Sequence, residues 1–202
     1  GGTPPVQQEP KLYPYGEGVK FLEVNCASRR SEIRNLLGTN RGPVTWPASP
    51  PSIDYTQSLR TIGIDAIRSH DFYGPTDWWV IFPTWSADPD AAASYDFTSS
   101  DLRIRAIREA GFECFYRLGT SWKGENPLPI NDPPGTTRGN SGRILHTADR
   151  DDFRKWATIC TNTVRHYNQG WADGHQFGIR YWEIWNEPDM SSQFWTGTPG
   201  QY

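Results

Sequence analysis

The chain has 202 residues, which is enough for one large domain with a substantial apolar core. Its formal net charge is −3, and acidic and basic residues are interleaved, so the sequence has no basic stripe of the kind that binds nucleic acid or an anionic membrane. No apolar run is long enough to cross a bilayer, and residues 1–10 show neither the basic nor the apolar region of an export signal. We therefore expect no nucleic-acid partner and no membrane association; an uncharged polar ligand fits better.

The three cysteines, Cys26, Cys114 and Cys160, are too few and too widely spaced for a disulfide framework. We expect them to be mostly buried thiols, although one disulfide and one free thiol would also fit the count. No pair of cysteines or histidines has the spacing of metal ligands, so the sequence predicts no metal site and no cofactor.

The N-terminal region differs in composition from the rest of the chain. Residues 1–18 are rich in proline, glycine and glutamine and are predicted to form an extended arm, which a short strand at 19–25 follows. We place a boundary after residue 30. Residues 1–30 form an arm and strand, which stand alone or belong to an accessory β-domain, and residues 31–202 form the main domain.

Strands and helices alternate in the main domain. The predicted strands lie at 33–40, 64–70, 112–119 and 179–186. The predicted helices lie at 53–61, at 98–111 and around Phe153 to Tyr167. In the second helix we expect Ser99 or Ser100 to cap the N-terminus. The residues expected on its buried face are Leu102, Ala106, Ile107 and Ala110.

This alternation predicts an α/β fold with a parallel sheet and right-handed crossovers. The loops that follow the strands are long, whereas the connections from helix to next strand, "TIGID" and "EAGFE", are short. This asymmetry is typical of a (β/α)8 TIM barrel, whose site is built from the loops at the carboxyl ends of the strands. A doubly wound sheet is the competing fold, but "LLGTNRGP" lacks the G-x-G-x-x-G spacing of its phosphate-binding turn.

The segment "RYWEIWNEPD" (180–189) places Glu187 at the end of the fourth predicted strand. In a barrel this position lies at the rim of the site, and flanking indole surface favours the neutral form of a carboxyl group. Such a group can protonate the leaving oxygen of a glycosidic bond, with a second carboxylate across the sugar. The plainer interpretation of Glu187 is a surface carboxylate that caps a following helix. Asn186 can hydrogen-bond a sugar hydroxyl or satisfy loop backbone groups.

Several motifs in this order resemble glycoside hydrolase family 39, the family of β-xylosidases and α-L-iduronidases: "GTNRGP", "IRSHD", "YDF", "FYRLG" and "YWEIWNEPD". The resemblance covers about residues 31–202. It implies a retaining mechanism with Glu187 as general acid/base, Asn186 on the sugar's 2-hydroxyl and His70 lining the sugar pocket. In the family the nucleophile is a second glutamate at the end of strand seven. The resemblance therefore implies that this chain carries only about the first four βα units and that the nucleophile lies outside it.

Further candidates lie at other strand ends. Arg68, two residues before His70, is expected to orient the acid/base, to hold the charge of the nucleophile, or to form an internal ion pair. Glu183 is expected to pair with Arg117 or Arg68. It is a poor candidate for the nucleophile, because carboxylates four residues apart on one strand are separated by well over the roughly 5 Å that retention requires. His70 has the alternative role of a satisfied core histidine.

Ten tryptophans are the unusual feature of the composition. Those in or beside the predicted strand-end loops, where an indole face can stack on a sugar ring, are Trp46, Trp78, Trp79, Trp85, Trp122, Trp185 and Trp195. We expect most of them to be packing residues. Trp122, directly after the third strand, is the first candidate for substrate contact, and Trp185 is a further one.

The sequence therefore predicts a retaining, exo-acting glycoside hydrolase, a β-xylosidase on plant-type oligosaccharides, which is secreted or periplasmic by inference from that substrate class. The alternative is a carbohydrate-binding or self-assembling half-barrel module without catalysis, in which a second chain or a second copy completes the barrel, because four strands leave two open edges.

Overall fold

The computed structural model describes residues 35–45, 52–70, 74–119 and 150–187, and, singly, residues 25, 27, 28, 31, 72, 121, 189 and 200. The chain divides into two units, Gly1–Arg34 and Asn35–Tyr202, and the architecture below is that of the second. Trp46, Trp122, Trp195 and nearly all of the predicted strand at 19–25 and loop at 120–146 lie outside the described residues.

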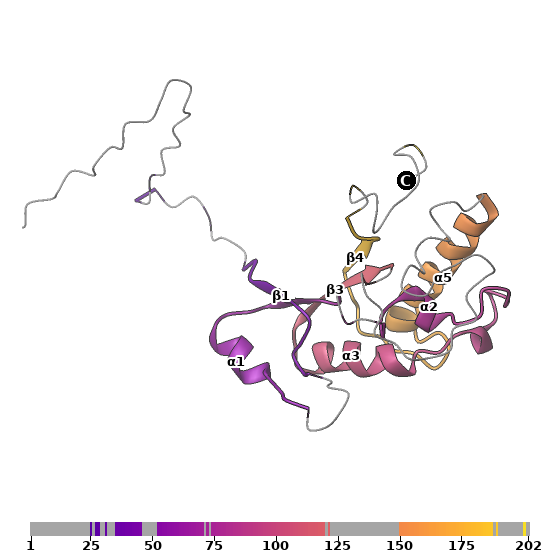
Figure 1. Cartoon of the computed structure of the whole chain (residues 1–202). Helices are drawn as coiled ribbons and strands as arrows, with labels where there is room; N and C mark the ends of the chain where they lie inside the picture. The colour runs from indigo at the N-terminus through magenta and orange to yellow at the C-terminus, as the bar shows by residue number, and fades with distance from the viewer. Residues whose placement is uncertain are drawn as a thin grey trace, which may run out of the picture. The chain divides into compact units, whose positions relative to one another are not determined.

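Four short strands form one parallel sheet: β1 Gly38–Asn40, β2 Ala66–Arg68, β3 Glu113–Leu118 and β4 Tyr181–Ile184 (Figure 1). They lie side by side in chain order, and the register pairs Arg68 with Phe115 and Arg117 with Glu183. Each strand falls inside its predicted range, so the expected α/β class with a parallel sheet is confirmed. Because the strands are parallel, their carboxyl ends lie at one edge of the sheet.

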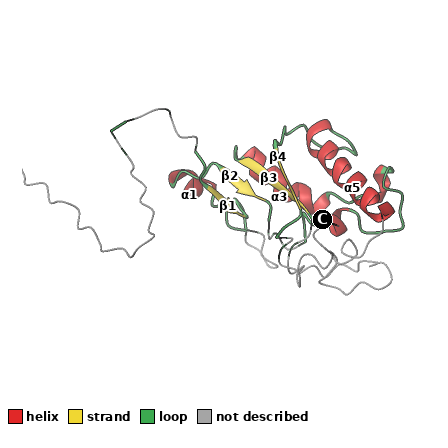
Figure 2. Ribbon diagram, turned by 90° about the horizontal axis from the view of Figure 1, so that it is seen from above, coloured by secondary structure: helices red, strands yellow, loops and turns green. Residues whose placement is uncertain are grey.

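Helices connect the strands in turn. They are α1 Thr56–Thr61, α3 Thr98–Glu109 and α5 Arg150–Gln169, and Figure 2 shows the strands between α1 and α5. The loop after β2 holds two further short elements, α2 Trp78–Ile81 and the 3-10 helix η1 Ala92–Ser94, which the sequence did not predict. All four residues of α2 are buried. No helix in the described part of the chain is both long and apolar enough to span a bilayer.

The core lies between the sheet and helices α3 and α5. Alternation along β2 and β3 points Ile67, Cys114 and Tyr116 to this face, where they pack against Ile104 and Ile107 of α3 and Cys160 and Tyr167 of α5. Cys114 and Cys160 are buried free thiols, as predicted, and burial raises the pKa of Cys114 to about 12. The same alternation points the side chains of Arg68, Phe115 and Glu183 to the opposite face.

The buried face of α3 agrees with the predicted one at Ile107 and in part at Ala110, but not at Leu102. Ser100, Ile104 and Ile107 are buried, at i, i+4 and i+7, whereas Leu102 is 48% exposed. Leu102 is two positions from both Ser100 and Ile104, which places it about 200° around the helix from each. The predicted cap is also different: neither serine caps the helix, and Oδ1 of Asp96 accepts a hydrogen bond from the Thr98 amide over 2.9 Å.

Candidate active site

The polar side chains at the carboxyl edge of the sheet come from two strands. Arg68 is the last residue of β2, and Ser69 and His70 follow it. Trp185, Asn186 and Glu187 follow β4. Between these two strands lies β3, which ends at Leu118 and continues into Gly119. In parallel α/β folds ligands bind at this edge, so these residues form the candidate active site.

Arg68 reaches across β3 to β4. Its guanidinium makes a forked ion pair with Glu183, in which Nε donates to Oε2 over 2.6 Å and Nη2 donates to Oε1. Nη2 also donates to Oδ1 of Asn186 over 2.9 Å. Side chains from alternate strands therefore meet on the face of the sheet that the helices do not cover, which is how the interior layers of a barrel are built. Of the roles expected for Arg68, the structure contains the internal ion pair, together with a hydrogen bond to the residue that precedes Glu187.

Arg68 also fixes the orientation of the Asn186 amide. A guanidinium only donates hydrogen bonds, so Asn186 presents its oxygen to Arg68 and turns its Nδ2 toward Glu187. Nδ2 donates to Oε2 of Glu187 over 3.2 Å. Asn186 is buried, whereas Glu187 is exposed. A fixed, buried amide thus holds a carboxyl group that a ligand can reach.

The backbone that carries Glu187 is strained. Trp185 and Glu187 have φ angles of 65° and 40°, which non-glycine residues rarely adopt and which cost on the order of 1–3 kcal/mol each. The loop is held to β3 by the Trp185 amide, which donates to the Leu118 carbonyl over 2.7 Å. A Cβ on Gly119 would lie 3.2 Å from Cα of Trp185, so the loop passes this closely because residue 119 has no side chain. Strain of this kind is concentrated at functional sites.

The structure places Trp185 differently from the expectation of a sugar-stacking residue. Its side chain is only 3% exposed, and its ring meets that of Trp156 edge-on, with the centroids 5.8 Å apart. Trp78 and Trp79 belong to the same buried cluster, and Trp85 packs against it. Trp185 therefore supports the Glu187 loop from inside. Trp122, the other tryptophan assigned to substrate, lies outside the described residues.

His70 is buried directly after β2, with 7% of its surface exposed. Burial and then the positive charges of Arg117 and Arg68 lower the pKa of His70 from 6.5 to about 4, against a smaller opposing effect of Glu183. The imidazole is therefore neutral near pH 7. His70 thus lies at the carboxyl edge of the sheet, as predicted, and its uncharged imidazole can donate or accept a hydrogen bond.

A buried ion pair next to this edge was not predicted from the sequence. Arg117 is fully buried and donates through Nη2 to Oδ1 of Asp77 over 2.6 Å, not to Glu183. The amide and hydroxyl of Ser121 donate to the same oxygen over 2.8 and 2.9 Å. Asp77 lies 40 positions from Arg117, in the loop after β2, so no local pattern in the sequence indicates the pair.

This arrangement can support proton transfer on an uncharged ligand. Glu187 is an exposed carboxyl group with a fixed hydrogen-bond donor beside it. Arg68 and Arg117 each face a carboxylate partner, so their charges are balanced within the protein. Both oxygens of Glu183 accept from Arg68, which leaves this carboxylate in a structural role.

Comparison with known proteins supports this interpretation at the level of the fold. No family model matches the chain, and no curated protein matches it. Among solved structures, it is similar to the crystal structure of a glucosidase from Croceicoccus marinus, with 28% sequence identity and a TM-score of 0.60. The match covers 83% of this chain and 32% of the glucosidase, so the chain spans about a third of that protein's length. The likeness indicates a glycosidase-like fold, and the four-stranded parallel sheet fits part of a TIM barrel.

Proposed function

We propose that the protein is a retaining glycoside hydrolase of family 39 type, in which Glu187 is the general acid/base. The observation that carries the proposal is the chain of contacts from Arg68 through Asn186 to Glu187. It holds an exposed carboxyl group at the carboxyl edge of a parallel sheet, where barrel enzymes place their catalytic residues. The similarity to a glucosidase supports the enzyme class independently of these contacts.

In this mechanism Glu187 first protonates the leaving glycosidic oxygen and then, as a carboxylate, accepts a proton from the attacking water. Asn186 positions Glu187 through one N–H of its amide, and the second N–H is the donor that we assign to the sugar's 2-hydroxyl. His70 lines the pocket as a neutral imidazole. No step requires a metal ion or an organic cofactor from this edge of the sheet.

The nucleophile of the proposed reaction is a second carboxylate, and it is not Glu183. Retaining enzymes place the two carboxyl groups about 5 Å apart across the sugar. Glu183 lies on β4, four residues before Glu187, and its two oxygens are engaged by Arg68. We therefore place the nucleophile on a different segment of the barrel from β4.

An uncharged glycoside is the substrate class that this edge favours, with a β-xyloside or a β-glucoside as the first candidates. A uronide would require a cationic group for its carboxylate. Two of the three described arginines at this edge, Arg68 and Arg117, have carboxylate partners already, which disfavours a uronide; the third is Arg41, directly after β1. The resemblance of the motifs to family 39 supports the xyloside, and the similarity to a glucosidase supports the glucoside. Such oligosaccharides lie outside the cytoplasm, so we propose a secreted or periplasmic enzyme.

A panel of nitrophenyl glycosides tests the proposal. With the segment that carries the nucleophile supplied as a second polypeptide, we expect release of nitrophenol from at least one member, and we expect the Glu187→Gln variant to lose about 10²–10⁴-fold of that rate. Glu109→Gln is the matched control, because Glu109 is an exposed carboxylate on α3 whose ion-pair partner among the described residues is Arg105 of the same helix. No release from any glycoside, or an unchanged rate in Glu187→Gln, would overturn the proposal.

A further inference from the structure

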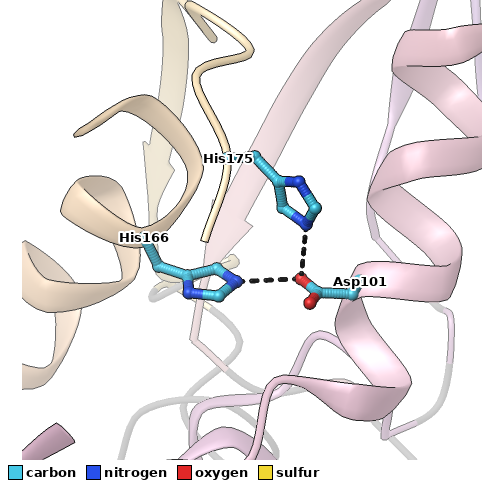
Figure 3. A group of neighbouring side chains, drawn as sticks. All are labelled: Asp101, His166 and His175. Atoms are coloured by element: carbon cyan, nitrogen blue, oxygen red, sulfur yellow. Dashed lines mark hydrogen bonds and ion pairs between the residues drawn. The ribbon is translucent and has the colours of Figure 1, made fainter. Parts of the chain in front are cut away.

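Three side chains from different elements converge at a second place in the fold (Figure 3). Asp101 lies in the first turn of α3, His166 in the last turn of α5, and His175 in the connection from α5 to β4. Oδ1 of Asp101 is 2.9 Å from Nε2 of His166 and 3.4 Å from Nε2 of His175. Because His175 precedes β4 and Glu187 follows it, this cluster lies toward the amino end of the strand, away from the candidate active site.

The contact made by Nδ1 of His166 determines whether the other ring nitrogen, Nε2, faces Asp101 with a hydrogen or with a lone pair. Nδ1 of His166 lies 2.9 Å from the Trp171 carbonyl oxygen, which only accepts, so Nδ1 carries a hydrogen. In the neutral imidazole, Nε2 then turns a lone pair toward the Asp101 carboxylate. Two lone pairs at 2.9 Å repel each other unless a proton or a metal ion lies between them. A backbone carbonyl that accepts from the distal ring nitrogen is the usual support of a metal-binding histidine.

His175 supplies a third donor atom. Its Nε2 is buried, and no hydrogen bond satisfies it among the described residues. The three ligand atoms of the cluster all lie within 4.8 Å of one another.

The segment that carries His175 is held tightly against the end of α5. The His175 amide donates to the His166 carbonyl over 2.6 Å, and the Gly170 amide donates to the His175 carbonyl over 2.9 Å. A Cβ on Gly174 would lie 2.2 Å from the His166 carbonyl oxygen, so only glycine permits this approach. The position of His175 relative to His166 is thus set by the backbone before any ion binds.

We propose that Asp101, His166 and His175 bind a divalent transition-metal ion, with Zn²⁺ as the preferred probe. Two imidazoles and one carboxylate are ligands that Zn²⁺ takes at about 2.0–2.2 Å, which places neighbouring ligand atoms about 3.3 Å apart in a tetrahedral site. The 3.4 Å between His175 and Asp101 already fits, and the His166 contact widens by less than half an ångström. The ligand nitrogens of the two histidines, which lie within 4.8 Å of each other, adjust to the same spacing when the ion binds. The side chains of Asp101 and His175 are partly exposed, so water can take the fourth position. The ion joins α3, α5 and the segment before β4.

Zinc titration of the metal-free 202-residue chain by calorimetry tests the site. We expect one Zn²⁺ per chain and at least tenfold weaker binding in His175→Gln and in Asp101→Asn. The matched control is Asp173→Asn, which removes an exposed carboxylate two residues before His175. This control should bind as the wild type does. Absence of one-to-one binding in the wild type, or unchanged binding in the two cluster variants, would overturn the proposal.

A second measurement on the wild type does not depend on the folding of variants. Diethyl pyrocarbonate modifies accessible imidazoles, and peptide mass spectrometry locates the modified residues. We expect Zn²⁺ to protect His175 at least tenfold relative to the metal-free chain. Equal modification of His175 with and without Zn²⁺ would mean that a proton, not a metal ion, lies in the cluster.

Discussion

Nη2 of Arg68 donates to Oδ1 of Asn186 over 2.9 Å, so a residue of β2 fixes the residue that precedes Glu187, 118 positions further along the chain. The contact passes over β3, the strand between them. It makes the position of Glu187 dependent on the packing of three strands and not on its own loop alone. We therefore predict that replacing Arg68 on β2 changes proton transfer by Glu187.

Replacing Arg68 by lysine tests this dependence. Lysine keeps the charge but cannot serve Glu183 and Asn186 with one planar fork, so we expect kcat/KM to fall about 10–100-fold through misplacement of Glu187. Glu183→Gln is the control, because it removes the ion pair but keeps an oxygen for Arg68. It should lower stability with a smaller loss of kcat/KM. A larger activity loss in Glu183→Gln than in Arg68→Lys would contradict the role given to Asn186.

The buried His70 predicts a pH dependence of stability. The pKa of His70 is about 4 in the folded protein and 6.5 is its ordinary value, so between these values the unfolded chain binds a proton that the folded chain does not. Stability should therefore rise with pH across this window, by about 3 kcal/mol in total. We expect His70→Gln to lose this contribution, as measured by urea unfolding at pH values from 4 to 7. Parallel curves for the two proteins would show that His70 titrates normally in the fold.

The Arg117–Asp77 pair should be the most costly ion pair to break. Asp77→Ala leaves Arg117 as a fully buried cation without its carboxylate, and we expect a loss of about 3–5 kcal/mol in the free energy of unfolding. Glu109→Ala breaks the exposed pair between Glu109 and Arg105 and should cost no more than about 0.5 kcal/mol. Denaturant unfolding measures both. Similar losses in the two variants would mean that water reaches the Arg117 site.

The order of strands and helices could be predicted from the sequence because it depends on local patterns. The apolar alternation around β2 and β3 and the helical spacing of apolar residues in α5 both act within one element. The exposure of Leu102 on α3, which was predicted to be buried, shows that a local pattern does not fix which apolar residues are buried. Leu102 and Ile104 are both apolar, and which of them is buried depends on the sheet and helix that pack against α3, not on α3 itself.

Of the candidate site, only the residues that directly follow a predicted strand could be predicted from the sequence. Asn186 and Glu187 follow a predicted strand directly, so their place at the edge follows from the fold class. The partner of Arg117 was unpredictable, because Asp77 comes from a loop whose path is set by tertiary packing. The Asp101, His166 and His175 cluster gave no signal for the same reason: its members are not at a spacing that one helix or turn brings together.

The role of Glu187 as a proton donor is tested most directly by the dependence on the leaving group. We would compare kcat/KM of the wild type and Glu187→Gln on a dinitrophenyl glycoside, whose phenolate leaves without protonation, and on a disaccharide of the same sugar, whose alkoxide does not. We predict that Glu187→Gln loses about 10²–10⁴-fold in kcat/KM on the disaccharide and much less on the dinitrophenyl glycoside. An equal loss on both substrates, or no loss on either, would contradict it.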